Sequence, residues 1–195
     1  MVMKSICMIF LLVASFSMYG QKWEKNYDFV DDCICGLSKV GKNGLVGYAD
    51  KKGKEVIPVE FNEGLTFSEG MVAVKKGGKW MYFDSTGKAI TQNIFDDATS
   101  FEGGMAAVSK SNLYGYINYS GEVLINYQFS NARTFKDGLA PAANAKGYWG
   151  FIDKQGNWVI KPQYAFADHF TENEARVMKG EKVFYINKEN SVLHE

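Results

Sequence analysis

Short apolar runs that alternate with polar residues recur along most of the chain, and glycine-rich turns separate them. One stretch shows this clearly: residues 71–74, 79–83 and 88–90 form three such runs, and Gly77-Gly78 separates the first two. Strand-length apolar runs joined by a two-residue glycine turn are typical of β-hairpins. The pattern therefore predicts an all-β protein assembled from hairpins, with three strands in each unit.

The same pattern returns with a fixed period. Gly53, Gly87, Gly121 and Gly156 follow one another at steps of 34, 34 and 35 residues, and Asn190 occupies the same place 34 residues later. A period of this size indicates a repeat architecture. We expect one domain over residues 21–195, with four full units in residues 36–172 and partial units at both ends. The favoured arrangement is a curved array of tandem units, and a closed propeller-like ring is the alternative.

Each unit carries the same turn chemistry. An aspartate or asparagine opens the second turn of every copy, at Asp50, Asp84, Asn118, Asp153 and Asn187. Glycine or asparagine closes it, as expected of a type I turn whose last residue is left-handed. A third repeated position holds Gly36, Gly70, Gly104, Gly138 and then Asn173. Asparagine tolerates a positive φ better than other non-glycine residues, so these positions are predicted to need one.

Two further repeated positions are aromatic and predict the core. The first holds Tyr27, Phe61, Phe95, Phe129 and Tyr164, and the second holds Cys33, Phe67, Phe101, Phe135 and Phe170. In the fourth unit Trp149 and Phe151 share one strand face and are also expected to be core. Gly150 lies between them, and a glycine inside a strand marks close approach by a neighbour.

These residues carry a resemblance to a known family. The run Trp149-Gly150-Phe151-Ile152-Asp153, followed by Gly156 and then Val159-Ile160, Pro162 and Tyr164, resembles the WG-repeat family of bacterial β-rich proteins. The similarity covers about residues 27–190. Tryptophan is missing before Gly47 and Gly115, and Met81 and Phe184 replace the glycine. The resemblance implies secreted or surface-associated repeat proteins and implies no reaction.

The two ends carry complementary parts of a unit. Residues 21–35 correspond to the back of a unit and residues 173–195 to the front. They can serve as atypical caps of an open stack, or they can pair and close a ring. We expect caps on an open or only partly closed array.

The first twenty residues have the organisation of a secretory signal peptide. Lys4 precedes an apolar run over residues 6–16, and Ser15, Ser17 and Gly20 provide small residues for cleavage. The run is too short to span a bilayer as a helix. The sequence thus predicts an exported protein, located in the periplasm, at the cell surface or outside the cell, whose mature chain has no transmembrane segment.

Composition supports these expectations and excludes some partners. Lys plus Arg and Asp plus Glu both number 22, so no overall charge attracts nucleic acid. Gly reaches 20 and aromatic residues 15%, which suits a chain with many turns and strands.

Candidate chemistry is sparse. Cys33 and Cys35 lie two residues apart and leave three possibilities open: a buried thiol, favoured because Cys33 sits at a core position, a disulfide, or a metal or redox site. The sequence has no nucleophile motif for which His169 could act as a catalytic base, and His194 is near the end of the chain. Each repeated turn offers one carboxylate, too few for calcium. We expect no enzyme activity, no metal site and no cofactor.

Two groups of surface residues remain as candidates for binding. Lysines crowd two turns, at Lys51, Lys52, Lys54, Lys75, Lys76 and Lys79, either as a basic stripe or, as we favour, as solvated tips that discourage aggregation. The aromatic residues outside the regular pattern are Tyr119, Tyr148 and Trp158, which are expected to be exposed.

The sequence therefore favours a non-enzymatic, exported repeat protein that acts as a binding or scaffold module for a protein or a cell-envelope component. A glycan-binding module that uses Tyr119, Tyr148 and Trp158 is the alternative.

Overall fold

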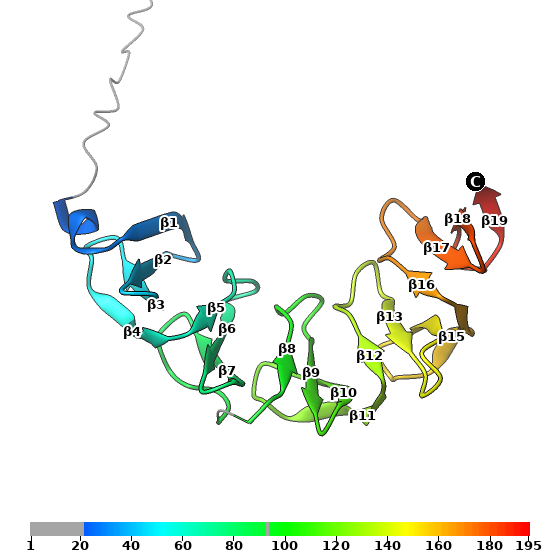
Figure 1. Ribbon diagram of the computed structural model, residues 1–195, viewed down its shortest axis with the longest axis horizontal. Coiled ribbons are helices and arrows are strands. Elements are labelled where there is room, and N and C mark those ends of the chain that lie inside the picture. Colours follow the sequence, from blue (N-terminus) through cyan, green and yellow to red (C-terminus); the bar gives the residue numbers. More distant parts are fainter. Residues whose placement is uncertain (1–21, 93) are drawn as a thin grey trace, which may run out of the picture.

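The computed structural model describes residues 22–92 and 94–195, which form one short 3-10 helix and five small antiparallel sheets (Figure 1). The expected signal peptide lies outside the described residues. The helix is η1 (Lys22–Asn26). Sheet 1 consists of β1 (Phe29–Ile34), β2 (Leu37–Lys42), β3 (Leu45–Asp50) and β4 (Glu55–Phe61). Sheet 2 consists of β5 (Glu63–Gly64), β6 (Met71–Lys76) and β7 (Lys79–Asp84).

The remaining three sheets have four strands each. Sheet 3 consists of β8 (Asp97–Ala98), β9 (Ala106–Lys110), β10 (Leu113–Ile117) and β11 (Val123–Phe129). Sheet 4 consists of β12 (Asn131–Ala132), β13 (Ala140–Ala143), β14 (Trp149–Ile152) and β15 (Trp158–Tyr164). Sheet 5 consists of β16 (Phe166–Ala167), β17 (Ala175–Lys179), β18 (Lys182–Ile186) and β19 (Val192–His194).

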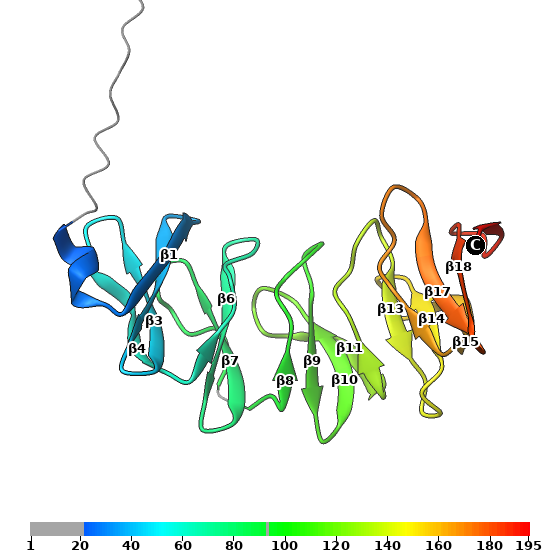
Figure 2. The same ribbon diagram turned by 45° about the horizontal axis from the view of Figure 1, so that its top comes forward.

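The sheets follow one another along an open arc. Figures 1 and 2 show sheet 1 and sheet 5 at opposite ends of the arc, with the other sheets in sequence order between them. The strands of each four-stranded sheet are also ordered as in the sequence, and consecutive strands are hydrogen-bonded neighbours. The expectation of an all-β, curved array of tandem units is confirmed, and the two ends do not meet to close a ring. Sheets 2 to 5 each begin with an additional strand of two residues that was not expected, whereas the first strand of sheet 1 has six residues.

The glycine of the repeated motif is required by its neighbouring strand. A Cβ atom at Gly150 would lie 2.3 Å from the carbonyl oxygen of Ile160, and Gly47 and Gly115 meet the next strand in the same way. The cause is a bulge in β15: Trp149 pairs with Tyr164 and Phe151 pairs with Ile160, so three residues face Gly150 alone. The prediction that a neighbour packs at Gly150 is confirmed.

Sheet 2 lacks one of the expected strands. Met81 takes the place of the motif glycine, and the third strand expected at residues 88–90 is not formed. Only isolated bridges remain, between Phe83 and Ala89 and between Trp80 and Phe95. The backbone N–H of Tyr82 donates to the hydroxyl group of Thr91 at 3.0 Å, so a side chain supplies a bond that a paired strand would make through its backbone. The expectation of a strand at residues 88–90 is therefore wrong.

The repeated turn has the predicted chemistry. In sheet 4, Oδ1 of Asp153 accepts hydrogen bonds from the backbone N–H groups of Gln155 at 3.0 Å and Asn157 at 2.8 Å. Gly156 closes the turn with φ +84°, and Asn190 and Asn173 have φ values of 65° and 69°. The prediction of left-handed residues at these positions is confirmed.

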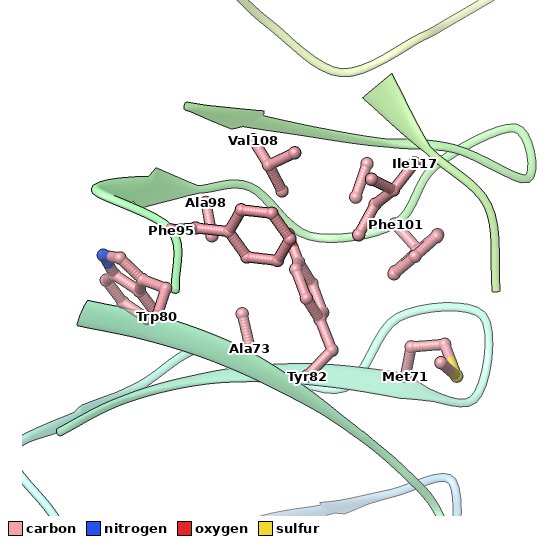
Figure 3. Packing of buried hydrophobic residues seen from close by; sticks show 10 residues of the cluster. Met71, Ala73, Trp80, Tyr82, Phe95, Ala98, Phe101, Val108 and Ile117 are labelled. Atoms are coloured by element: carbon pink, nitrogen blue, oxygen red, sulfur yellow. The ribbon is translucent and has the colours of Figure 1, made fainter. Parts of the chain in front are cut away.

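The core lies in the junctions between successive sheets. Figure 3 shows one junction, in which Tyr82 of β7 points at Phe101 and Phe95 from the side of sheet 3. The rings of Tyr82 and Phe101 meet edge to face with centroids 5.2 Å apart, a favourable aromatic geometry. The predicted aromatic core positions from Phe61 onward are buried, as is Phe151, whereas Tyr27 and Trp149 are half-buried.

Both ends of the arc are capped. Trp23 of η1 covers Gly53, whose Cβ position would lie 2.4 Å from the indole, and the indole N–H donates a hydrogen bond to the carbonyl oxygen of Lys51 at 3.2 Å. In sheet 5, Glu174 occupies a position that is Leu or Met in the other sheets, and its carboxylate lies 3.0 Å from Nε2 of His194. Terminal units that differ from the internal ones in this way are expected for an open stack.

Candidate binding surface

One set of loops lines the concave side of the arc. These loops, at residues 35–36, 65–70, 99–104, 133–138 and 168–173, connect the first strand of each sheet to the second, and in Figure 1 they turn towards the concave side. We call them the concave loops. Because loops held by a rigid scaffold commonly carry binding residues, this is the first surface to consider.

A carboxylate fastens the loops of sheets 2 and 3 together. Glu69 accepts hydrogen bonds from the N–H groups of Gly103 and Gly104, each at 2.9 Å, and from the hydroxyl group of Tyr119 at 2.7 Å. Partial burial opposes ionisation of Glu69, but these donors and the nearby Lys154 outweigh it and lower its pKa. Desolvation and the bond to Glu69 raise the pKa of Tyr119 to about 12. These charge-assisted hydrogen bonds hold the two loops together, and we call them the Glu69 clasp.

Equivalent clasps join the later sheets. The residue after the turn Asp or Asn reaches back to the preceding sheet in each case: Nζ of Lys154 donates to the carbonyl oxygen of Gly103 at 2.6 Å, and Nζ of Lys188 donates to that of Asp137 at 2.8 Å. Tyr119 holds the same position in sheet 3. The concave loops are thus tied to one another along most of the arc.

The loops of sheets 3, 4 and 5 also share a polar chain. The hydroxyl group of Thr134 donates to Oε2 of Glu102 at 2.9 Å and lies 3.0 Å from Nε2 of His169. Burial and the positive charge of Arg133 lower the pKa of His169, so its ring is neutral at pH 7. Asp168 accepts from Arg133 at 3.2 Å and from Arg176 at 3.0 Å. His169 is thus placed in a structural network between loops.

A pocket opens between the concave loops of sheets 1 and 2. Its volume is about 430 Å³, and Leu37, Tyr48 and Phe67 contribute buried apolar surface to its lining. Asp31, Asp32 and Lys39 are its charged lining residues, and Nζ of Lys39 lies 3.2 Å from Oδ2 of Asp31. We call it the first rim pocket.

A second pocket lies at the concave loop of sheet 5. Its volume is about 480 Å³, and its lining is predominantly polar. Asp168, Arg176 and Tyr185 line it together with Glu172, Glu174 and Lys136. We call it the last rim pocket. The two pockets therefore lie at opposite ends of the arc.

The three aromatic residues singled out from the sequence do not share one surface. Tyr119 and Tyr148 are exposed, at 43% and 49%, as predicted. Tyr119 follows the end of β10, whereas Tyr148 precedes the start of β14, so they lie at opposite edges of the arc. Trp158 is half-buried, with its ring edge to face against Phe129 at 5.5 Å, and the expectation that it is exposed is wrong. Its ring packs against the buried cluster that contains Phe129, whereas Val123 and Val192 at the same repeat position are exposed.

The lysine clusters do not form a stripe. Lys51, Lys52 and Lys54 lie in the turn after β3, and the other group lies at the opposite edge, in the hairpin between β6 and β7. The second group is paired with acidic side chains: Lys75 with Glu63 at 2.8 Å, Lys76 with Glu60 at 3.1 Å, and Lys79 with Asp96. These charges belong to solvated hairpin ends, as favoured from the sequence.

Cys33 and Cys35 are both exposed, free thiols. The expectation of a buried Cys33 is wrong. In later sheets the equivalent phenylalanine is buried by an aromatic ring of the preceding sheet, as Phe67 is by Tyr48. Cys33 belongs to the first sheet and lacks such a neighbour among the described residues.

Residues 22–92 and 94–195 contain no group of three or more His, Cys, Asp or Glu side chains placed to hold a metal ion. Within the same part of the chain, no helix has the length and apolar character needed to cross a membrane.

The repeated geometry is accompanied by a family match. The family model described as WG containing repeat matches four consecutive segments, residues 47–80, 80–114, 114–146 and 149–182. The chain therefore belongs to the WG containing repeat family, and the resemblance inferred from its motifs is confirmed. No curated protein matches the chain.

Solved structures with a similar fold are β-propeller-like proteins. Hsv2p from Kluyveromyces lactis is 13% identical with a TM-score of 0.53, and the match covers 84% of this chain and 64% of that structure. The computationally designed Ika8 protein is 15% identical with a TM-score of 0.51, over 82% of this chain and 58% of that structure. The chain spans about three fifths of these structures. At such identities the likeness describes the fold alone.

Sequence reasoning missed the Glu69 clasp and both rim pockets. The one available signal was charge at repeat positions that are otherwise small or apolar, such as Lys39 and Arg176 where other units have Ala73, Ala107 and Pro141.

Proposed function

We propose that this chain is a non-enzymatic, exported binding module that holds a protein or cell-envelope partner on the concave side of its arc. The observation that carries the proposal is the clasped set of concave loops, with a pocket at each end. Loops fixed in this way present their side chains without a large ordering cost on binding. The propeller-like fold is compatible with this role, although fold alone does not establish function.

Export rests on the signal-peptide pattern of residues 1–20. Its test is the mass of the chain recovered from outside the cytoplasm. We expect a mature protein that begins within residues 18–21, after loss of the apolar run. Recovery of the full-length chain only in the cytoplasm would contradict export.

Site-specific photo-crosslinking tests the binding surface. A photoreactive amino acid is placed at Ser100, in a concave loop, and in a matched variant at Lys146, in the hairpin between β13 and β14. We expect a discrete crosslinked partner from Ser100 and none from Lys146 in the native host. Crosslinking from Lys146 alone would move the binding surface to the opposite edge.

A glycan-binding role is the second candidate, and one observation favours it: Tyr148 is half-exposed at a hairpin end. Tyr119 is already engaged by Glu69 and Trp158 by Phe129, so a sugar would find one aromatic platform instead of three. A saturable tryptophan or tyrosine fluorescence response to envelope polysaccharide fragments, abolished by Tyr148→Ala, would support this alternative.

A further inference from the structure

The two rim pockets are lined by residues at equivalent positions of the repeat, one in the first unit and one in the last. Asp31, Lys39 and Tyr48 of the first pocket correspond to Asp168, Arg176 and Tyr185 of the last, and each pair is separated by 137 residues, which is four repeat periods. Both pockets thus combine an aspartate, a cation paired with it and a tyrosine.

The three middle units lack this combination. At the positions of Asp31 and Lys39 they carry Leu65 with Ala73, Thr99 with Ala107, and Arg133 with Pro141. Thr99 and Ala107 are joined by hydrogen bonds, including one from the N–H of Ala107 to the Thr99 hydroxyl at 3.0 Å. The acid–cation pair is therefore particular to the two end units of the arc.

Each pocket has one lining carboxylate that forms no ion pair with the described residues. The first has Asp31 and Asp32 against Lys39. In the last, Asp168 pairs with both Arg133 and Arg176, and the carboxylate of Glu174 lies 3.0 Å from Nε2 of His194, which leaves the carboxylate of Glu172. The acid–cation pairs are partly exposed, so a ligand cation can reach their carboxylates. The complementary ligand for each pocket carries one positive charge.

The lining also fits the shape of such a ligand. Leu37 and Ile34 border the first pocket, and the ring of Tyr185 borders the last. An aliphatic stem can lie on these apolar surfaces while its charged end reaches the carboxylates. Lysine and arginine side chains have this form.

We propose that the two rim pockets each bind a lysine or arginine side chain, and that one extended peptide with two basic residues is held at both ends of the arc. This inference rests on the proposed concave binding surface and names its ligand. Two linked contacts raise the effective concentration of the second, so affinity depends on the spacing between the basic residues.

The test uses synthetic glycine-serine peptides and the full-length exported protein. One peptide carries a single arginine, and a series carries two arginines separated by linkers of increasing length. We expect weak binding of the first and an optimum spacing in the series at which affinity is roughly 100-fold higher. Peptides with glutamate in place of arginine should not bind. Two-arginine peptides that bind no better than the single-arginine peptide at any spacing would overturn the proposal.

Matched variants locate the binding. Asp32 and Glu172 make no hydrogen bond or ion pair with other described residues, so Asp32→Asn and Glu172→Gln remove one charge from each pocket without breaking a contact. Glu181→Gln makes the same charge change in the hairpin between β17 and β18. Each pocket variant should lower the affinity for the two-arginine peptide towards that for the single-arginine peptide. Glu181→Gln should leave the affinity unchanged.

An equal loss in all three variants would indicate a general charge effect and overturn the pocket assignment. If no basic peptide binds while Ser100 still crosslinks a partner, the ligand class is wrong and the concave binding surface stands. Absence of both results would contradict the two proposals together.

Discussion

The hydroxyl group of Tyr48 in sheet 1 donates a hydrogen bond of 2.5 Å to the carbonyl oxygen of Leu65 in sheet 2. The next two junctions repeat this bond, from Tyr82 to Thr99 at 2.6 Å and from Tyr116 to Arg133 at 2.8 Å. At the fourth junction a phenylalanine, Phe151, takes the position of the tyrosine. One buried side chain thus supplies both an apolar ring and a polar connection to the next sheet.

Replacing Tyr82 with Phe should therefore destabilise the protein, because the carbonyl oxygen of Thr99 loses its partner in a buried junction. We expect a loss of about 1–2 kcal/mol in the free energy of unfolding. Tyr185→Phe is the matched control, since Tyr185 lies at the end of the arc and should change stability little. Urea denaturation measures both. Equal losses would mean that the hydroxyl group matters for another reason than the junction.

The repeated turn allows a second comparison between neighbouring residues. Gly156 has φ +84°, and a Cβ atom there would lie 2.9 Å from Cγ2 of Ile125 in the preceding sheet. Gly156→Val should cost on the order of 1–3 kcal/mol more than Gln155→Val, because a β-branched residue is strained at positive φ. Thermal or urea unfolding of the two variants is the measurement, and identical midpoints would contradict the assignment.

The Glu69 clasp should weaken in acid. Because the folded state lowers the pKa of Glu69, the stability that this carboxylate contributes is present above its unfolded pKa and is lost as pH falls through the folded value. The amide signals of Gly103 and Gly104 should therefore titrate below pH 4.5, the ordinary value of the carboxyl group, in an NMR experiment. Glu69→Gln should remove this titration. Persistence of the titration in that variant would assign it to another group.

Removal of residues 173–195 tests the independence of the sheets. Stability of a repeat stack is mostly local, so the deletion should expose one junction and leave distant ones intact. Hydrogen exchange should show protection retained around Trp80 and Tyr116 and lost mainly in residues 149–164. Loss of protection as far as Tyr48 would show that the arc folds as one cooperative unit.

The sequence predicted the features that depend on one unit. Gly150 and the Asp153 turn were recognisable because their geometry needs particular residue types, glycine for a close backbone and an acidic side chain for a turn. The prediction of a strand at residues 88–90 was wrong because the Thr91 side chain, and not a strand backbone, accepts the bond from Tyr82, which the alternation of apolar and polar residues does not reveal. The prediction that Cys33 is buried was wrong because an aromatic ring of the preceding sheet buries this repeat position in the later units, and Cys33 lies in the first sheet.

The candidate site was harder to predict than the fold. The bond between Glu69 and Gly103 joins residues one period apart, and whether they meet depends on the angle between successive sheets. The rim pockets depend on that angle too, because Asp32 and Thr66 come from different sheets. No spacing of residue types along the chain specifies such an angle, so these features required the three-dimensional arrangement.

The clasps have a consequence for how such proteins can vary. Each one joins only adjacent sheets, by contacts that recur in register, so gain or loss of a whole 34- or 35-residue unit in the middle would preserve every remaining joint. The separation between the two end pockets would then change by one unit at a time. If the end pockets bind as proposed, the number of repeats sets the spacing that the two basic residues of a ligand must have.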